Sequence, residues 1–157
     1  GIALLATLAQ KGRAIAFLST PLDSTRYEEH QSLQSYLGEH GVIVTPFSPI
    51  DGTKRWYISI QTEMLTSLSQ AMVICEEKDG GSSIKNAMNM TRDKKDVYIF
   101  DHSLSDRSLL WPRNLSKDER VIVVKESSSI VTHIRKNCDN LENKKKILAT
   151  EQLSLFD

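Results

Sequence analysis

Short apolar segments alternate with longer segments of helical periodicity along most of this chain. A short continuous apolar run predicts a strand buried on both faces of a parallel sheet, whereas apolar residues three or four apart predict one face of a helix. Strands are expected at residues 14–18, 42–44, 71–75, 97–100 and 121–124. Helices are expected at residues 2–10, 25–39, 55–70, 82–91 and 128–137, with an irregular stretch over 103–119. This alternation predicts an α/β protein with a doubly wound, mostly parallel sheet.

The first predicted helix, at residues 2–10, opens the sequence without a preceding strand. Its apolar face is expected to be formed by Ile2, Leu5, Leu8 and Ala9, with Leu4 beside them. In an alternating α/β chain, each helix normally follows a strand. We therefore expect the first strand of a βα unit to lie before residue 1 and to be missing from this chain.

The segment from residue 71 to residue 91 has the pattern of a strand, a glycine-containing turn and a helix N-terminus. The polar loop after the strand ends in Gly80 and Gly81, and Ser82 or Ser83 is placed to cap the helix. Free backbone N–H groups and the positive end of the helix dipole meet at such a turn, which favours a bound phosphate. The segment is neither a P-loop nor a GxGxxG motif, so an ordinary tight turn is the alternative.

Ligands of open parallel sheets bind outside the carboxyl ends of the strands. The residues that we expect to bind a ligand or its phosphate at this rim are Ser19, Thr20, Glu76, Gly80, Gly81, Ser82, Ser83 and Lys85. Glu76 and Asp101 end neighbouring strands and can act as paired carboxylates or contact ribose hydroxyls, unless both are solvated strand ends. His102 is either a base or DNA contact, or an exposed loop histidine. No residue is assigned to catalysis.

Two further segments combine aromatic and cationic side chains. Lys54, Arg55 and Trp56 follow a proline-containing loop and form a candidate surface for stacking on bases and contacting phosphates. The alternative is that Trp56 belongs to the apolar face of its helix and Arg55 is its solvated start. Arg113, in the sequence WPRN from residue 111, is a second candidate because its segment has no helical face to bury.

Composition narrows the class of protein. The 157 residues suffice for one domain with a substantial core, and 20 Lys and Arg residues balance 20 Asp and Glu residues. A nucleic-acid contact would therefore be a local patch on a chain without a global basic field. Cys75, on a strand expected to be buried, and Cys138 form no metal-binding spacing and no disulfide framework, so we expect no metal and no cofactor. Without a signal peptide or an apolar run that could span a bilayer, the sequence predicts a cytoplasmic protein.

The pattern of buried segments ends near residue 138, which predicts a domain of residues 1–138. Residues 139–150 are polar and contain a run of three lysines, as expected of a solvated linker. Residues 151–157 then bring three apolar side chains together, those of Leu153, Leu155 and Phe156. An apolar cluster beyond a polar linker is typical of a short recognition motif and not of a core element.

The body of the chain resembles the DNA-processing protein A (DprA/Smf) family, which shares a Rossmann-like superfamily with the LOG nucleotide hydrolases. The resemblance covers residues 1–135 and rests on short segments in family order: residues 8–16 (LAQKGRAIA), 41–44 (GVIV), 68–76 (LSQAMVICE), 80–82 (GGS) and 97–100 (VYIF). It implies a Rossmann-like fold in a protein that binds single-stranded DNA and helps to load a recombinase. It also implies that the family's first glycine-rich loop would lie before residue 1.

The chain departs from the family pattern in two places. The sequence Gln61-Thr62-Glu63 occupies the place of Arg-Asn-Arg, and Lys85 occupies the place of the glycine-loop threonine. The LOG enzymes use an arginine with a PGGxGTxxE loop, and the glycine pair here lacks both the preceding proline and the following glutamate. The resemblance therefore implies a binding protein more than a hydrolase, with Lys85 as a cation for the same ligand.

The tail resembles the bacterial sliding-clamp-binding motif at every one of its five positions. These are Gln152, Leu153, Ser154, Leu155 and Phe156. In such a motif, leucine and phenylalanine fill apolar pockets while glutamine hydrogen-bonds at the rim. The resemblance implies the β sliding clamp as a partner. The alternative is a tail that packs on its own domain or on a second subunit.

These observations predict a nucleic-acid- or nucleotide-binding protein of bacterial DNA metabolism, tethered to the β sliding clamp and acting in recombination, repair or replication. The alternative, from a different class, is a LOG-like enzyme or sensor that binds or hydrolyses nucleotides at the same rim. The expected partners are the clamp, single-stranded DNA or a nucleotide, and a second copy of the chain in a homodimer.

Overall fold

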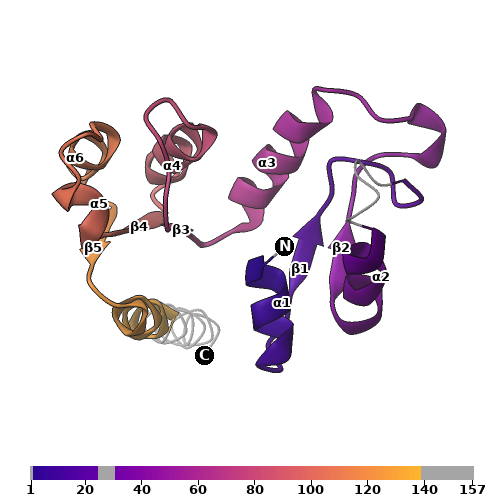
Figure 1. The fold of residues 1–157 in the computed structure, drawn as a ribbon, viewed down its shortest axis with the longest axis horizontal. Coiled ribbons are helices and arrows are strands. Elements are labelled where there is room, and N and C mark those ends of the chain that lie inside the picture. The colour runs from indigo at the N-terminus through magenta and orange to yellow at the C-terminus, as the bar shows by residue number, and fades with distance from the viewer. Residues whose placement is uncertain (1, 25–30, 139–157) are drawn as a thin grey trace, which may run out of the picture. The chain divides into compact units, whose positions relative to one another are not determined.

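A computed structural model describes residues 2–24 and 31–138 of this chain (Figure 1). The chain divides into two compact units, Gly1–Ser69 and Gln70–Asp157. Both are built from helices and parallel strands, which confirms the predicted α/β class. Within the described residues, the strands pair in two groups, a two-stranded sheet and a three-stranded sheet. The linker and tail expected at residues 139–157 lie outside the described residues.

The first unit carries two parallel strands, β1 (Ile15–Phe17) and β2 (Val42–Val44). Its helices are α1 (Ile2–Ala9), α2 (Gln31–His40) and α3 (Tyr57–Leu68), with a 3-10 helix at Pro49–Asp51. Strand β2 has the predicted bounds, and α3 lies inside the helix expected at residues 55–70.

The core of the first unit is formed by side chains of α1, α2 and the two strands, namely Ala14, Ala16 and Leu37 with Leu4, Leu8, Leu33 and Ile43 packed against them. The predicted apolar face of α1 is therefore wrong in part. Leu4 and Leu8 pack against the core, whereas Ile2 is 87% exposed and Leu5 is 44% exposed. Both choices satisfy the helical period, so the position of β1 beside the helix decides which face is buried.

The second unit contains the parallel strands β3 (Ala71–Ile74), β4 (Asp96–Phe100) and β5 (Val121–Val124), paired in that order. Helix α4 (Ser82–Arg92) joins β3 to β4, the short helices α5 (Asp101–Ser105) and α6 (Trp111–Leu115) lie between β4 and β5, and residues 127–138 are helical. The prediction of an irregular stretch over 103–119 is wrong, because α6 and part of α5 fall within it. Five-residue helices are too short to show a helical period in the sequence.

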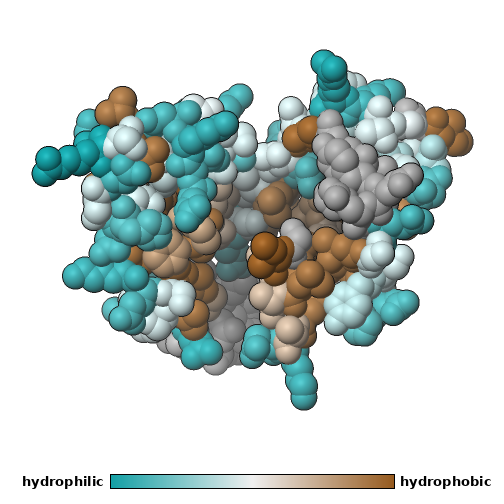
Figure 2. Space-filling view, in the orientation of Figure 1, coloured by the Kyte–Doolittle hydropathy of each residue, from teal (hydrophilic) through white to brown (hydrophobic). Residues whose placement is uncertain are grey.

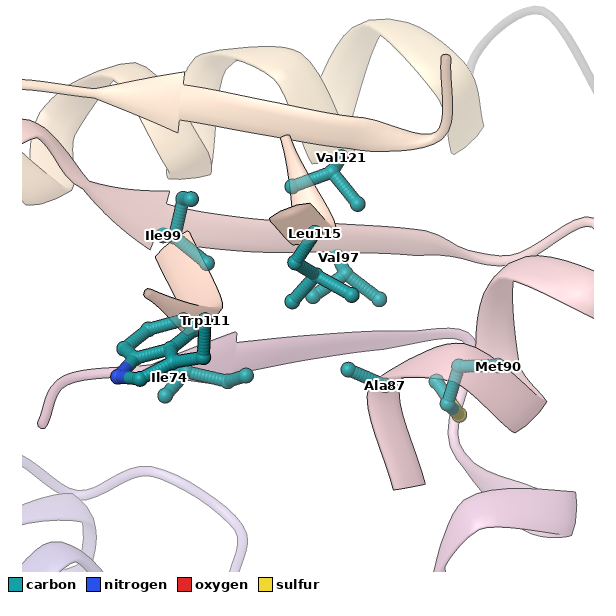
Figure 3. Packing of buried hydrophobic residues seen from close by; sticks show 8 residues of the cluster. All are labelled: Ile74, Ala87, Met90, Val97, Ile99, Trp111, Leu115 and Val121. Atoms are coloured by element: carbon teal, nitrogen blue, oxygen red, sulfur yellow. The ribbon is translucent and has the colours of Figure 1, made fainter. Parts of the chain in front are cut away.

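Alternate residues of the three-stranded sheet face two separate apolar layers. On one face, strand residues pack against α4 and α6 in a cluster of Ile74, Ala87, Met90, Val97, Ile99, Trp111, Leu115 and Val121 (Figure 3). On the other face, Tyr98 and Val124 pack against Ile130 of the helix at residues 127–138. Helices therefore cover both faces of this sheet, as the doubly wound pattern predicts (Figure 1).

Trp111 is a core residue, and this corrects the expectation that its segment has no helical face to bury. Only 3% of Trp111 is exposed, and its indole Nε1 donates a hydrogen bond of 2.9 Å to the Glu77 carbonyl oxygen. Pro112 is also fully buried, while the neighbouring Arg113 is exposed. The single turn of α6 thus directs its apolar residues inward and leaves the arginine at the surface.

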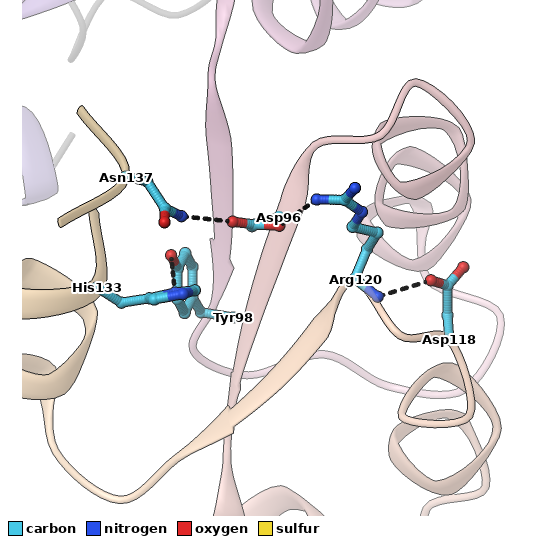
Figure 4. A network of polar contacts seen from close by, with 6 residues as sticks. All are labelled: Asp96, Tyr98, Asp118, Arg120, His133 and Asn137. Carbon is cyan, nitrogen blue, oxygen red and sulfur yellow. Dashed lines mark hydrogen bonds and ion pairs between the residues drawn. The ribbon is translucent and has the colours of Figure 1, made fainter. Parts of the chain in front are cut away.

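Polar contacts join the beginning of β4 to β5 and to the last described helix (Figure 4). The Asp96 carboxylate accepts hydrogen bonds from Arg120 Nη1 over 3.4 Å and from Asn137 Nδ2 over 3.1 Å. The Tyr98 hydroxyl lies 2.9 Å from His133 Nδ1. Burial, and then the negative charge of Asp96, raise the pKa of Tyr98. The hydroxyl is therefore protonated at neutral pH and can donate a hydrogen bond to His133.

Hydrophilic side chains cover much of the face shown in Figure 2, with hydrophobic side chains exposed among them.

Strand β3 ends at Ile74, so Cys75, which we expected on a buried strand, is exposed. Its thiol is free, like that of Cys138. No helix within residues 2–24 and 31–138 is both long enough and apolar enough to cross a membrane.

Candidate functional site

The loop between β3 and α4 is organised by the carboxylate of Glu77. Glu77 Oε1 accepts a hydrogen bond from the Lys78 N–H over 3.0 Å, and Oε2 accepts one from the Ser83 N–H over 3.2 Å. Helix α4 therefore begins after Gly81 with the Glu77 carboxylate as its cap, and the expectation that Ser82 or Ser83 supplies the capping side chain is wrong. A methyl group on Gly81 would overlap the Glu77 side chain, which would have to move and give up its position as the cap.

This cap occupies part of the predicted phosphate site. The Ser83 hydroxyl first, and then the backbone N–H groups of Lys78 and Ser83, hold the pKa of Glu77 below its ordinary value. The carboxylate is therefore ionised at neutral pH and neutralises the positive end of the α4 dipole. A phosphate could bind the same backbone groups only by displacing Glu77.

Glu77→Gln is expected to remove an acid-sensitive part of the stability of the second unit. Because the folded-state pKa lies below the ordinary value of 4.5, the carboxylate stabilises the fold above that pH, and this contribution is lost as pH falls through the lower folded-state value. The urea midpoints of the two proteins should differ at neutral pH and converge in acid, below the folded-state pKa of Glu77. Glu119→Gln, at an exposed position of the same unit, should show no such pH dependence. A difference that is equal at both pH values would contradict the capping role.

A second acidic residue of this loop, Asp79, caps helix α6. Its carboxylate accepts hydrogen bonds from the Leu110 N–H over 3.0 Å and from the Trp111 N–H over 2.8 Å. This role could not be predicted from the sequence, because Asp79 lies 31 residues before its first partner. Glu77 thus joins the loop to the start of α4, and Asp79 joins it to the start of α6. Both residues also accept hydrogen bonds from Trp111, one from its indole and one from its backbone N–H.

A pocket of about 260 Å³ lies at the carboxyl ends of β3 and β4, lined by Glu76, Glu77, His102, Ser103, Asp106 and Leu109. The Asp106 carboxylate accepts hydrogen bonds from the Ser108 hydroxyl over 2.7 Å and from its N–H over 2.8 Å. These bonds, the hydroxyl first, lower the pKa of Asp106, with a smaller contribution from the charge of Arg113. The His102 ring stacks on Phe100 at 5.7 Å between ring centres. The pocket is therefore strongly acidic.

The structure groups some of the predicted rim residues and separates others. Glu76 and His102 meet in the pocket, and Ser82, Ser83 and the exposed Lys85 lie on the first turn of α4. Ser103 of α5, and Asp106 and Leu109 in the loop after it, were not predicted, because this stretch was expected to be irregular. Ser19 and Thr20 belong to the first unit. There the Thr20 hydroxyl donates to the Ser24 carbonyl over 3.0 Å, while its own carbonyl accepts from Thr45.

The segment that begins at Lys54 forms an aromatic and cationic cluster on the first unit. Trp56 is 54% exposed, so the alternative that it faces the core is wrong, and the following Tyr57 is the buried residue, stacked on Phe47. The Lys54 ammonium lies 5.7 Å from the Trp56 ring centre and 5.9 Å from the Tyr57 ring centre. Arg55 is exposed beside them. This arrangement presents an indole face and two cations to solvent.

Comparison with known proteins identifies the family. Residues 1–135 match the model of the DNA recombination-mediator protein A family. The chain belongs to this family. The resemblance of residues 1–135 to this family is thereby confirmed. Among the residues that the structure describes, no group of three or more His, Cys, Asp or Glu side chains is arranged to hold a metal ion.

Relatives of the DNA recombination-mediator protein A family support the fold. DNA processing protein DprA of Streptococcus pneumoniae is 21% identical over 102 residues, which are 65% of this chain and 36% of that protein. The X-ray structure of the same S. pneumoniae protein matches with a TM-score of 0.71 at 18% identity, over 83% of this chain and 46% of that one. The structure of DNA processing protein A from Helicobacter pylori, described with its single-stranded DNA binding mode, also matches with a TM-score of 0.71. The identity is 13%, over 87% of this chain and 63% of that one. The chain thus spans less than two thirds of these relatives, and the Rossmann-like fold is confirmed.

Proposed function

We propose that this chain binds single-stranded DNA and acts in DNA recombination, repair or replication. The family match over residues 1–135 carries the proposal, and the single-stranded DNA binding mode of the H. pylori relative supports it. A cytoplasmic location and a binding role without catalysis are part of the same proposal. Arg-Asn-Arg of the family pattern is replaced here by Gln61-Thr62-Glu63, so the cations must come from elsewhere in the fold.

The cluster of Lys54, Arg55 and Trp56 supplies the chemistry for this contact. An exposed indole offers a flat face on which any base can stack, which is worth about 1–3 kcal/mol for each base. The two cations beside it can neutralise phosphates and release counterions. Tyr57 and Phe47, stacked at 3.6 Å between ring centres, support the indole from the core side. Arg113, exposed on the second unit, is a further phosphate contact in this proposal.

Binding of a labelled dT oligonucleotide, followed by fluorescence anisotropy, tests the proposal. Trp56→Ala is expected to weaken binding by about 5- to 150-fold, because it removes one stacked base contact. Lys54→Ala/Arg55→Ala should make the salt dependence less steep, by about 0.7 in the slope of log K for each lost phosphate contact. Tyr36→Ala, at an exposed aromatic residue stacked on His40 in the same unit, is the matched control and should bind normally. Equal affinities of the Trp56 and Tyr36 variants would refute the stacking role.

We further propose that residues 152–156 attach this chain to the β sliding clamp. Every position of the motif is present, and it follows a polar segment that contains three consecutive lysines. Leu153, Leu155 and Phe156 would enter apolar pockets of the clamp, while Gln152 would hydrogen-bond at their edge. The polar segment would let the attached DNA-binding unit reach the strand near the clamp.

A nucleotide-hydrolysing enzyme or sensor of the LOG type is the second candidate function, and the pocket beside β3 and β4 favours it. That pocket combines Glu76, Asp106 and His102, which are residue types used in acid–base chemistry. Incubation with nucleoside 5′-monophosphates, followed by chromatography, tests for release of the free base. Intact nucleotides after prolonged incubation at high protein concentration would exclude this activity for the substrates tested.

A further inference from the structure

The side chains that line the acidic pocket at the ends of β3 and β4 disfavour the phosphate of a nucleotide and favour a base with N–H donors. Its six lining residues include three carboxylates and no lysine or arginine. Two of the carboxylates, those of Glu77 and Asp106, are held in the ionised form by hydrogen bonds from serine residues. A phosphate entering this pocket would meet fixed negative charge, whereas a group with N–H donors would meet acceptors.

Ser103 adds an independent indication that the pocket receives a ligand. The residue is only 5% exposed and lines the pocket, yet its hydroxyl has no hydrogen-bond partner among the residues that the structure describes. Among the described residues, no fully buried side-chain oxygen lacks a partner, so the Ser103 hydroxyl is open to the pocket and is solvated from that side. The Ser103 hydroxyl is thus a free donor and acceptor next to the carboxylates.

The remaining walls and the size of the pocket suit a flat ring. The imidazole of His102 and the side chain of Leu109 offer apolar or aromatic contact area. The volume of about 260 Å³ lies just below the usual size of small-molecule sites, which suits a ligand as small as one base.

We propose that this pocket binds a single unpaired nucleobase that carries an exocyclic amino group, with cytosine as the best fit. The amino group of cytosine donates to carboxylates, which is how Glu and Asp recognise this base in DNA complexes. The ring nitrogen beside the amino group accepts from the Ser103 hydroxyl. Thymine presents a carbonyl oxygen at the position of the amino group, and this oxygen faces the carboxylates without a proton between them. The inference rests on the proposed binding of single-stranded DNA and adds a base preference to it.

Oligonucleotides of dC and dT with equal length, measured by anisotropy at neutral pH, test the preference. The protein is expected to bind the dC strand at least about fivefold more tightly than the dT strand. Glu76→Gln and Ser103→Ala should each reduce this ratio toward one while they retain binding of the dT strand. Glu119→Gln, at an exposed position of the same unit, is the control and should keep the ratio. A ratio near one for the unchanged protein, or a ratio that survives both pocket variants, would overturn the proposal.

A titration with deoxycytidine and with thymidine, monitored by NMR, separates this inference from the proposed function. Both nucleosides lack phosphate, so their binding does not depend on Lys54, Arg55 or Trp56. Deoxycytidine is expected to shift the signals of His102 and Leu109, and thymidine is not. If neither oligonucleotide binds but deoxycytidine does, the DNA-binding function fails while the pocket assignment stands. If both oligonucleotides bind and neither nucleoside shifts these signals, the pocket assignment fails alone.

Discussion

Replacement of both Leu153 and Phe156 by alanine is expected to abolish binding of this chain to a bacterial β sliding clamp. Each of these anchors should contribute on the order of 2 kcal/mol if it fills an apolar pocket. Loss of both would raise the dissociation constant by about a thousandfold, because each 1.4 kcal/mol is a factor of ten. Isothermal titration calorimetry of the purified chain against the clamp measures this difference directly.

The matched control for the tail is Ile147→Ala/Leu148→Ala, which removes two apolar side chains just before the motif. This variant should bind the clamp like the unchanged chain. Equal affinity of the Leu153/Phe156 variant and the control would refute clamp binding through residues 152–156. A lower melting temperature of the Leu153/Phe156 variant without a clamp would instead support the alternative that the tail packs on its own domain or on a second subunit.

Trp111→Ala is expected to lower the free energy of unfolding of the second unit by about 3–5 kcal/mol, the usual cost of removing a buried tryptophan. The indole fills the layer between α6 and the three-stranded sheet, and its Nε1 donates to the Glu77 carbonyl. Truncation would leave a cavity and an unpaired backbone carbonyl on Glu77, the residue whose side chain caps α4. Urea unfolding followed by far-UV circular dichroism measures the loss.

The chain provides its own control, because its other tryptophan is at the surface. Trp56 is 54% exposed, so Trp56→Ala should change the free energy of unfolding by less than about 1 kcal/mol. The two variants should therefore give opposite results: Trp111→Ala is unstable, and Trp56→Ala is stable but weak in DNA binding. A Trp111→Ala protein as stable as Trp56→Ala would show that the packing in Figure 3 does not hold in solution.

The candidate site could be predicted only in part. Glu76 and His102 were expected at the carboxyl ends of successive strands, and the pocket brings them together. The capping role of Glu77 could not be predicted, because it depends on how the loop folds back onto the N-terminus of α4. Asp106 directly follows α5, a helix too short to leave a periodic pattern in the sequence, so its place in the pocket could not be predicted either.

The sequence by itself determined the α/β class, the order of the strands and of the longer helices, and the family, because apolar periodicity and short motifs are local properties. It placed β2 and β5 to the residue, since short β-branched runs between polar loops have one interpretation in this context. Only the tertiary structure decided which face of α1 is buried and which of the two tryptophans enters the core. Both choices satisfy the same local pattern, and the difference arises from contacts with residues far away in the chain, such as Leu8 with the first core and Trp111 with Glu77.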